Sequence, residues 1–262
     1  MSDELFQVDG QVVLVSGASR GIGRALAEGF CRRGAQVVIT GREQSTLDQT
    51  AKELSELGRP VRALTCDVAD AEAIPQLIQQ VLSEFGRIDS LLNVAGVNKR
   101  KKVETFTPEE YDFILDINLR GAFLLAQAVG RHMIERGGGG TIINIDSLNT
   151  YSPLKGVVPY AMSKAGLSMM TRGMAMEWGE HGIRVNAIAP GFILTDLTRK
   201  LWSDPRMQAW GDANTPLKRL GQPGDLIGTA IFLASPASAF MTGQVLYVDG
   251  GITAGTMWPI EL

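Results

Sequence analysis

Three residues in the middle of the chain have the types and the spacing for proton transfer. Tyr160 follows Ser147 by thirteen positions, and Lys164 follows Tyr160 by four. On a helix this i, i+4 spacing places the phenol and the ammonium on one face. A phenol that accepts a proton near neutral pH needs a pKa about 3 below its ordinary value, and one cation about 4 Å away lowers it by roughly that amount, although burial opposes the effect. The spacing predicts a tyrosine acid/base assisted by lysine.

A glycine-rich turn near the N-terminus has the features of a dinucleotide phosphate site. Its glycines, Gly17, Gly21 and Gly23, follow an apolar run and open a helical pattern. Glycine allows positive φ angles and lacks a Cβ, so that backbone N–H groups and the helix N-terminus can face a pyrophosphate. Glycine turns also join strands to helices in proteins that bind nothing, and it is the position after a strand that favours a cofactor. The predicted contacts are Gly17, Ser19, Arg20, Gly21, Ile22 and Gly23.

The residues after the second apolar run indicate which dinucleotide is bound. No acidic residue ends this run to accept hydrogen bonds from an adenosine ribose 2′-hydroxyl, and Arg42 follows it instead. Arg42 and Arg20 together can hold a 2′-phosphate, which favours NADP(H) while leaving NAD(H) open. The alternative is a pair of solvated arginines, one of them neutralised by Glu43.

Short runs rich in Val and Ile predict the strands that position these residues. They cover residues 12–15, 37–39, 61–64, 91–94, 141–145, 183–188 and 245–248. Between them, residues 22–31, 47–57, 74–85 and 111–134 have apolar positions at helical spacing. Strict alternation of strand and helix predicts an α/β fold, a doubly wound Rossmann-type parallel sheet of about seven strands with helices on both faces.

The pattern indicates a single domain over residues 1–262. The cofactor half covers about residues 1–150, and the catalytic and substrate half covers about residues 140–262. Residues 195–220 contain Trp202, Met207, Trp210 and Pro216 without a clear strand. This insertion is either a lid over the ligand crevice or a surface helical excursion.

Composition and charge exclude several other classes of protein. Twenty-five basic against 28 acidic residues give a net charge of −3, without the positive field that nucleic-acid binding needs. Two cysteines and two histidines are too few for a disulfide framework or a structural zinc site, so no metal is expected, and His132 and His181 are assigned no function. The acidic N-terminus and the lack of an apolar run long enough to span a bilayer predict a cytoplasmic protein without a membrane partner.

Several stretches make the chain resemble the short-chain dehydrogenase/reductase family over essentially its whole length. They are Gly17…Gly21-Ile22-Gly23, Cys66-Asp67-Val68, Asn93-Val94-Ala95-Gly96, Asp116-Ile117-Asn118, Ser147, Tyr160-Ala161-Met162-Ser163-Lys164, Arg184-Val185-Asn186, Pro190-Gly191 and Tyr247-Val248-Asp249-Gly250-Gly251. The resemblance implies that Tyr160 is the general acid/base and that Ser147 hydrogen-bonds the substrate oxygen. It implies that Lys164 lowers the phenol pKa and binds the nicotinamide ribose, and that Asn118 holds a water in a proton relay behind Lys164.

The same resemblance implies further cofactor contacts. They are Asp67 and Val68 at the adenine, Asn93, Ala95 and Gly96 beside the cofactor, Tyr160 and Lys164, and Pro190, Gly191, Ile193 and Thr195 around the nicotinamide. Three residues depart from the family's usual pattern: Ser16, Val94 and Asp146, the last of which stands directly before Ser147. Asp146 is expected to alter the local electrostatics.

Four cations, residues 99–102, follow the fourth strand and border the predicted crevice. Lys99 or Arg100 is predicted to clamp a substrate carboxylate, and this pair resembles gluconate 5-dehydrogenases within the family. A solvated basic loop is the alternative, and it is the expectation for Lys101 and Lys102. The predicted substrate contacts are Lys99, Arg100, Ser147, Asn149 and Tyr160.

Three functions remain open from the sequence. The first is reversible NAD(P)-linked oxidation of a secondary hydroxyl on a sugar or sugar acid such as gluconate. The second is a 3-oxoacyl-(acyl-carrier-protein) reductase, in which the basic residues dock an acidic carrier. The third is a regulator that senses NADP without turnover, which the intact Asn118, Ser147, Tyr160 and Lys164 argue against.

The methionines of residues 162–176 are expected to fill the core. The family resemblance adds a homotetramer, built through the helix that begins near Tyr160 and through the last strand. Trp258-Pro259 near the C-terminus is either a cap on a neighbour's active site or a frayed tail.

Overall fold

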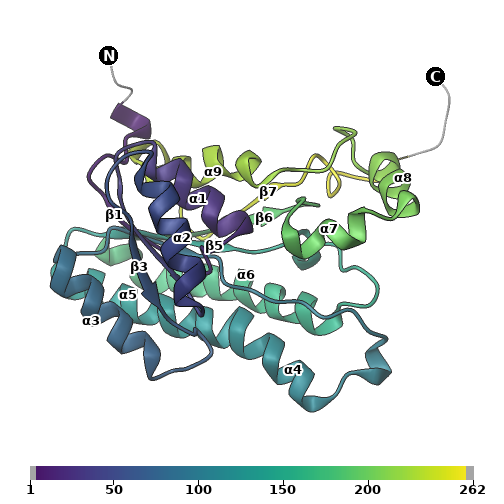
Figure 1. Cartoon of the computed structure of the whole chain (residues 1–262), viewed down its shortest axis with the longest axis horizontal. Coiled ribbons are helices and arrows are strands. Elements are labelled where there is room, and N and C mark those ends of the chain that lie inside the picture. Colours follow the sequence, from purple (N-terminus) through teal and green to yellow (C-terminus); the bar gives the residue numbers. More distant parts are fainter. Residues whose placement is uncertain (1–3, 258–262) are drawn as a thin grey trace.

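The computed structural model describes residues 4–257, in which seven strands form one parallel sheet in the order β3-β2-β1-β4-β5-β6-β7 (Figure 1). The strands are β1 (Val12–Val15), β2 (Gln36–Gly41), β3 (Arg62–Thr65), β4 (Ser90–Asn93), β5 (Gly140–Ile145), β6 (Ile183–Pro190) and β7 (Val245–Val248). The predicted doubly wound sheet of about seven strands is therefore confirmed. Trp258 and Pro259 lie outside the described residues.

The strand order reverses at β1, and this reversal positions the site. From β1 the chain goes to β2 on one side, whereas β4 pairs with β1 on the other. The predicted crevice lies at this reversal, beyond the carboxyl ends of β1 and β4, which is where open α/β sheets bind ligands.

Helices cover both faces of the sheet (Figure 1). On one face lie α1 (Gly21–Cys31), α2 (Gln44–Ser55) and α9 (Ile227–Ala234), and on the other lie α3 (Ala73–Phe85), α5 (Ala122–Arg136) and α6 (Val158–Trp178). Phe30 of α1 and Leu47 of α2 are fully buried in the first core layer, as Leu77 of α3 and Val129 of α5 are in the second. Short 3-10 helices join these elements: η1 (Glu4–Phe6), η2 (Val103–Thr105), η4 (Leu148–Thr150), η5 (Gly179–His181), η6 (Pro223–Leu226) and η7 (Pro236–Ser238).

A long helical run precedes β5. It consists of α4 (Pro108–Leu115), a π-helical turn η3 (Asp116–Gly121) and α5. Over Pro108–Arg136 this run is long and apolar enough to cross a membrane, so the expectation that no apolar run reaches that length was wrong. The expectation failed because the isolated charges of Asp116 and Arg120 interrupt the run without making it polar on average. Half of its most apolar window is buried in the protein.

Residues 195–220 form two short helices beyond the carboxyl edge of the sheet, α7 (Asp196–Trp202) and α8 (Pro205–Asn214). The ring of Phe192 holds them together because it makes edge contacts with Trp202 at 5.1 Å and Trp210 at 5.4 Å. The segment is thus packed against the loop that follows β6.

The methionines of α6 do not all lie in the core. Met174 is buried, but Met162, Met169 and Met176 are exposed by 48%, 65% and 85%. The expectation of core packing was wrong for these three, because they lie on the face of α6 that is open to solvent.

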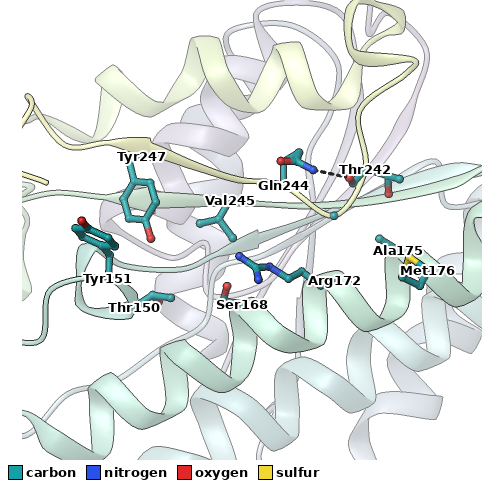
Figure 2. Close-up of a pocket in the computed structure, with 11 residues that line it drawn as sticks. Thr150, Tyr151, Ser168, Arg172, Ala175, Met176, Thr242, Gln244, Val245 and Tyr247 are labelled. Atoms are coloured by element: carbon teal, nitrogen blue, oxygen red, sulfur yellow. Dashed lines mark hydrogen bonds between the residues drawn. The ribbon is translucent and has the colours of Figure 1, made fainter. Parts of the chain in front are cut away.

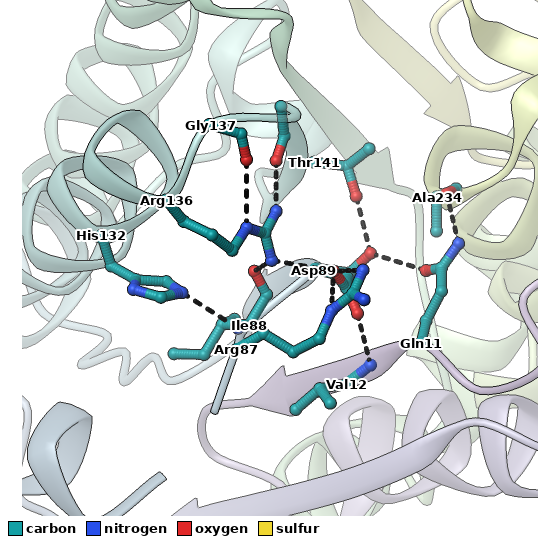
Figure 3. Close-up of polar contacts among 12 residues, drawn as sticks. Gln11, Val12, Arg87, Ile88, Asp89, His132, Arg136, Gly137, Thr141 and Ala234 are labelled. Atoms are coloured by element: carbon teal, nitrogen blue, oxygen red, sulfur yellow. Dashed lines mark hydrogen bonds and ion pairs between the residues drawn. The ribbon is translucent and has the colours of Figure 1, made fainter. Parts of the chain in front are cut away.

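At the amino edge of the sheet a buried carboxylate joins three segments (Figure 3). Asp89 accepts hydrogen bonds from the backbone N–H of Val12 (2.9 Å), the Arg87 guanidinium (2.8 Å at Nε) and Arg136 Nη1 (2.9 Å). Beside it, Nε2 of His132 accepts from the backbone N–H of Ile88 at 3.3 Å. This network lies at the opposite end of the strands from the predicted crevice, and it connects β1, the segment before β4 and the end of α5.

Candidate active site

The glycine-rich turn after β1 requires its glycines. Gly17 and Gly21 have φ angles of +64° and +58°. A Cβ on Gly17 would lie 2.7 Å from Cα of Ala95, and a Cβ on Gly23 would collide with the carbonyl of Gly17. The backbone is therefore packed closely against the β4 loop, and the N-terminus of α1 faces the crevice, as a bound pyrophosphate needs.

Ser16 fixes the two sides of the crevice to each other. Its hydroxyl accepts hydrogen bonds from the backbone N–H groups of Val94 (3.0 Å) and Ala95 (3.2 Å). The Asn93 side chain is held in place by α5, because its Nδ2 donates a hydrogen bond to the carbonyl of Ala122 at 2.8 Å. The predicted wall of Asn93, Ala95 and Gly96 thus lies directly beside the glycine turn.

The adenosine end of the crevice offers positive charge. Arg20 and Arg42 are both exposed, and neither forms an ion pair with any residue from 4 to 257. Glu43 instead accepts a hydrogen bond from Ser45, so it does not neutralise Arg42. The Thr40 hydroxyl at the end of β2 is buried without a partner among the described residues. These groups fit a phosphorylated ribose.

The remaining predicted cofactor contacts lie around the same crevice. Asp67 follows β3 and accepts from the backbone N–H of Ala69 at 3.0 Å, beside the buried Val68. After β6, Gly191 approaches the backbone of Asp249 so closely that a Cβ would lie 2.6 Å from its Cα. Thr195 comes within 3.8 Å of the position that a Cβ on Gly21 would occupy. The loop after β6 therefore reaches back to the glycine turn.

Ser147 is held as a hydrogen-bond donor. It is buried, and its Oγ accepts from both the backbone N–H and Nδ2 of Asn149, each at 3.1 Å. A serine oxygen has two acceptor sites, so the hydroxyl proton remains free to point elsewhere. The Asn149 side chain is occupied at its other end too, where Oδ1 accepts from the backbone N–H of Leu154 at 2.9 Å. Asn149 therefore orients Ser147, and its direct contact with substrate stays a prediction.

Lys164 and Tyr160 lie on one face of α6, as their spacing predicts. The Lys164 ammonium is 5.7 Å from the centre of the Tyr160 ring. It is buried and donates a 2.6 Å hydrogen bond to the carbonyl of Ile145. Burial lowers the pKa of Lys164 to about 8, and the nearby Asp146 carboxylate acts in the opposite direction.

The pKa of Tyr160 is raised, not lowered as the sequence argument expects. Burial raises it most, a hydrogen bond with Ser147 lowers it, the Asp146 charge raises it, and Arg100 lowers it. The expectation failed because the desolvation of the phenolate outweighs the protein's own cations at this site. Near neutral pH the isolated protein thus holds Tyr160 as a protonated phenol.

Asn118 joins the wall of the crevice to α6. Its amide makes a pair of hydrogen bonds with the backbone of Val97, at 2.8 and 2.9 Å, and Nδ2 also reaches Ser163 Oγ at 3.1 Å. Both Nδ2 protons are thereby used, whereas Oδ1 keeps a second acceptor site, and a role in holding a relay water stays a prediction. Ser163 was not among the predicted residues, although its place directly before Lys164 was a usable signal.

The cations of the basic loop, residues 99–102, differ in whether they form ion pairs. Lys99 and Lys101 both bind Glu110, at 3.4 and 2.7 Å, and lie over the rings of Phe113 and Phe106 respectively. The expectation that Lys101 is solvated was therefore wrong, because Lys101 forms an ion pair with Glu110, the capping-box carboxylate of α4. Arg100 is exposed, forms no ion pair within residues 4–257, and is near enough to affect the pKa of Tyr160. Of the two predicted clamps, Arg100 is the one left available.

A separate cavity of about 620 Å³ lies between α6 and β7 (Figure 2). It is lined by Ser168, Arg172 and Tyr247, among others, and by none of the predicted site residues. Tyr151 and Tyr247 make an edge contact at 6.1 Å on its rim. This cavity is distinct from the crevice.

Comparisons with known proteins extend over nearly the whole chain. A family model described as enoyl-(acyl carrier protein) reductase matches residues 17–253. Gluconate 5-dehydrogenase from Gluconobacter oxydans is 40% identical over 250 residues, covering 95% of this chain and 97% of that protein. A 3-oxoacyl-(acyl-carrier-protein) reductase from Synechocystis sp. is 40% identical over 244 residues, covering 92% and 96%. The solved gluconate 5-dehydrogenase from Burkholderia cenocepacia, in complex with NADP and tartrate, has a TM-score of 0.93 at 39% identity and covers 97% of this chain and 99% of that one.

Proposed function

Because the chain belongs to the short-chain dehydrogenase/reductase family, we propose that it interconverts a secondary alcohol and a ketone on a sugar acid, with NADP(H) as the hydride carrier. The observation that carries this proposal is the Ser147 hydroxyl in hydrogen-bond contact with the Tyr160 phenol, with Lys164 on the same helix face as Tyr160. A donor and an acid/base at one substrate oxygen are what this reaction needs.

The cofactor assignment is supported by the shape and charge of the crevice. The glycine turn of Gly17, Gly21 and Gly23 would hold the pyrophosphate, and Arg20 and Arg42 would hold the 2′-phosphate. The solved relative from Burkholderia cenocepacia contains NADP. When bound, the nicotinamide supplies the hydride acceptor or donor, and its oxidised ring adds positive charge near Tyr160.

The residues of this chain then perform the proton chemistry. Ser147 donates a hydrogen bond to the substrate oxygen, and Tyr160 exchanges the proton with that oxygen. The Lys164 ammonium, which burial places in a poorly solvated position, favours the phenolate when the alcohol is oxidised. In ketone reduction the raised pKa of Tyr160 keeps the phenol protonated and ready to donate. Asn118 is proposed to support a water relay behind Lys164.

The substrate class is supported by Arg100 and by the relatives. Of Lys99, Arg100 and Lys101, Arg100 is the one without a carboxylate partner among residues 4–257, and its charge acts on Tyr160. Guanidinium groups bind carboxylates in a planar two-point contact. Two of the relatives described above are gluconate 5-dehydrogenases. A carboxylated polyol satisfies both observations.

A 3-oxoacyl-(acyl-carrier-protein) reductase is the second candidate, because a relative of that name is equally identical at 40%. In that case Arg100 and its neighbours would meet an acidic carrier protein instead of a sugar carboxylate.

A spectrophotometric panel tests the proposal. Gluconate, other aldonates, matched uncharged polyols and acetoacetyl thioesters are each assayed with NADP(H) and with NAD(H). We expect turnover of an aldonate or its keto form with NADP(H) at a higher kcat/KM than any thioester. Turnover of the thioester alone would establish the second candidate. Tight NADPH binding without turnover of any compound would instead indicate a regulator that senses the cofactor.

The same proposal includes an assembly of four chains. The exposed methionines of α6 are accompanied by exposed Phe113 and Phe123 on α4 and α5, and β7 is an edge strand of the sheet. Light scattering after size exclusion tests this, because a monomer mass would contradict it.

The proposal has three further parts: a cytoplasmic location, an organisation as one domain over residues 1–262, and a lid role for residues 195–220. The location is supported by the free, buried Cys31 and Cys66, and the lid by the packing of α7 and α8 at the carboxyl edge.

A further inference from the structure

A carboxyl group is buried at the end of β5, one residue before Ser147. Asp146 is 2% exposed. Its Oδ1 accepts a 2.6 Å hydrogen bond from the Thr150 hydroxyl, and its backbone N–H donates to the carbonyl of Ile188 at 2.7 Å. Its Oδ2 is fully buried and has no hydrogen-bond partner among residues 4–257. An incompletely satisfied buried carboxylate is costly, and such groups are found where they serve the chemistry of a site.

The charge of Asp146 acts on both reacting residues of α6. The Asp146 carboxylate favours the protonated form of Lys164 and disfavours ionisation of Tyr160. The Lys164 ammonium in turn favours the ionised form of Asp146. The ammonium reaches the same segment directly, since it donates to the carbonyl of Ile145, the residue before Asp146. The three groups therefore form one electrostatic unit.

Other charged and titratable groups face this unit from neighbouring elements. Tyr247 of β7 has its pKa raised by burial and by Asp146, while Arg172 of α6 lowers it. Arg100, from the loop after β4, favours the Tyr160 phenolate. Asp249, after β7, acts on Tyr247. The charge that acts on Asp146 itself comes from Lys164.

We propose that Asp146 is a positioning residue of the reaction, a buried carboxyl group whose charge keeps Lys164 protonated and holds Tyr160 in its phenol form. The proposal rests on the proposed function. Burial raises the pKa of Asp146 to about 6, whereas that of Lys164 is about 8. Between these values both groups are charged, so the catalytic lysine has its counter-ion in the physiological pH range. Below about pH 6 Asp146 takes up a proton and the opposition to the phenolate disappears.

The first test is the pH profile of kcat/KM for Asp146→Asn, which keeps the shape of the side chain and removes its charge. We expect the alkaline limb to move to lower pH by about one pH unit, because Lys164 loses its proton more readily once the nearby carboxylate charge is gone. KM should stay within about twofold, since Asp146 acts through other residues. A rate lowered equally at every pH, with both limbs in place, would reduce Asp146 to a structural role and overturn the proposal.

Thr150→Val is the matched variant. It removes the hydrogen bond that lowers the pKa of Asp146 but retains the carboxyl group. We expect the alkaline limb to stay in place, because Asp146 is still ionised there. A shift of that limb as large as the one in Asp146→Asn would attribute the effect to the hydrogen bond and contradict the proposal.

The second test needs no turnover and so separates this proposal from the proposed function. Infrared difference spectra of the protein without substrate are recorded as pH falls. We expect a buried carboxylic-acid carbonyl band that appears with a midpoint near pH 6 and moves to higher pH in Lys164→Met, which removes the cation that favours the carboxylate. A midpoint that does not respond to Lys164→Met would show that the two groups are uncoupled, even if Asp146→Asn does not fold.

Discussion

Asn149 donates two hydrogen bonds to Oγ of Ser147, one from its backbone N–H and one from Nδ2, each 3.1 Å long. The pair fills the acceptor positions of the serine oxygen and leaves its proton to be directed at a substrate oxygen or at Tyr160. The protein thereby fixes which way a rotatable hydroxyl points before any ligand arrives. Such preorganisation of a donor is among the larger contributions to catalysis.

Asn149→Ala removes one of the two donors and lets the Ser147 hydroxyl turn. We expect kcat to fall about tenfold with little change in KM, since the lost interaction acts mainly in the transition state. The substitution Asn149→Asp should be worse, because the new carboxylate would accept the serine proton that the substrate needs. Steady-state kinetics of both variants check this order, and native activity in the Asn149→Asp variant would refute the role.

Arg100→Ala should raise KM for carboxylated polyols about tenfold or more, because it removes a charge-assisted hydrogen bond to the carboxylate. Uncharged polyols should be unaffected. Lys102→Ala is the control, since Lys102 is an exposed cation in the same loop. An equal rise in KM for charged and uncharged substrates, or an equal rise in Lys102→Ala, would show that Arg100 does not bind the substrate carboxylate.

Arg42→Ala should weaken NADP binding about tenfold and leave NAD binding within about twofold, because only NADP carries the 2′-phosphate. Fluorescence titration with the two reduced cofactors gives both dissociation constants. Arg32→Ala, at the far end of α1, is the matched control. If both cofactors weaken together in Arg42→Ala, this arginine does not discriminate between them.

His132 makes the fold sensitive to acid. Its Nε2 accepts a hydrogen bond from Ile88, and burial, with help from the nearby Arg136 charge, lowers its pKa below the ordinary 6.5. In the unfolded chain the group is half protonated at pH 6.5, whereas in the folded protein it stays neutral to lower pH. Its contribution to stability is therefore present above pH 6.5 and is lost as the pH falls through the folded pKa.

We expect urea unfolding of His132→Gln to show a smaller loss of unfolding free energy between about pH 7 and about pH 5 than the native protein shows. Gln can accept the Ile88 hydrogen bond without titrating. His181→Gln serves as the control, since His181 is exposed on η5. Parallel pH dependences of all three proteins would show that His132 does not titrate on unfolding.

Much of the fold could be read from the sequence because buried parallel strands are continuous apolar runs. The run at residues 12–15 coincides with the fully buried β1, and the run at residues 245–248 coincides with β7, an edge strand that is only partly buried. Boundaries elsewhere moved where polar residues extend a strand, as Gln36 and Thr40 do for β2. The π-helical turn of η3 left no trace in the helical pattern, because one extra residue in a turn barely disturbs the apolar spacing.

The site was predictable to the extent that local spacing determines it. Tyr160 and Lys164 share a helix face, and the spacing of four residues shows this directly. The pKa of Tyr160 could not be predicted, because it depends on how completely the folded protein excludes water from the phenol. The pairing of Lys99 and Lys101 with Glu110 was also missed, since it depends on how α4 packs beside the basic loop.

The most direct test of the acid/base role of Tyr160 is the kcat/KM of Tyr160→Phe in NADP-linked oxidation of the best aldonate. The substitution removes only the phenolic oxygen, so NADP binding should stay within about twofold while kcat/KM falls by about three orders of magnitude. An unchanged kcat/KM in a variant that still binds NADP would show that no proton passes through Tyr160.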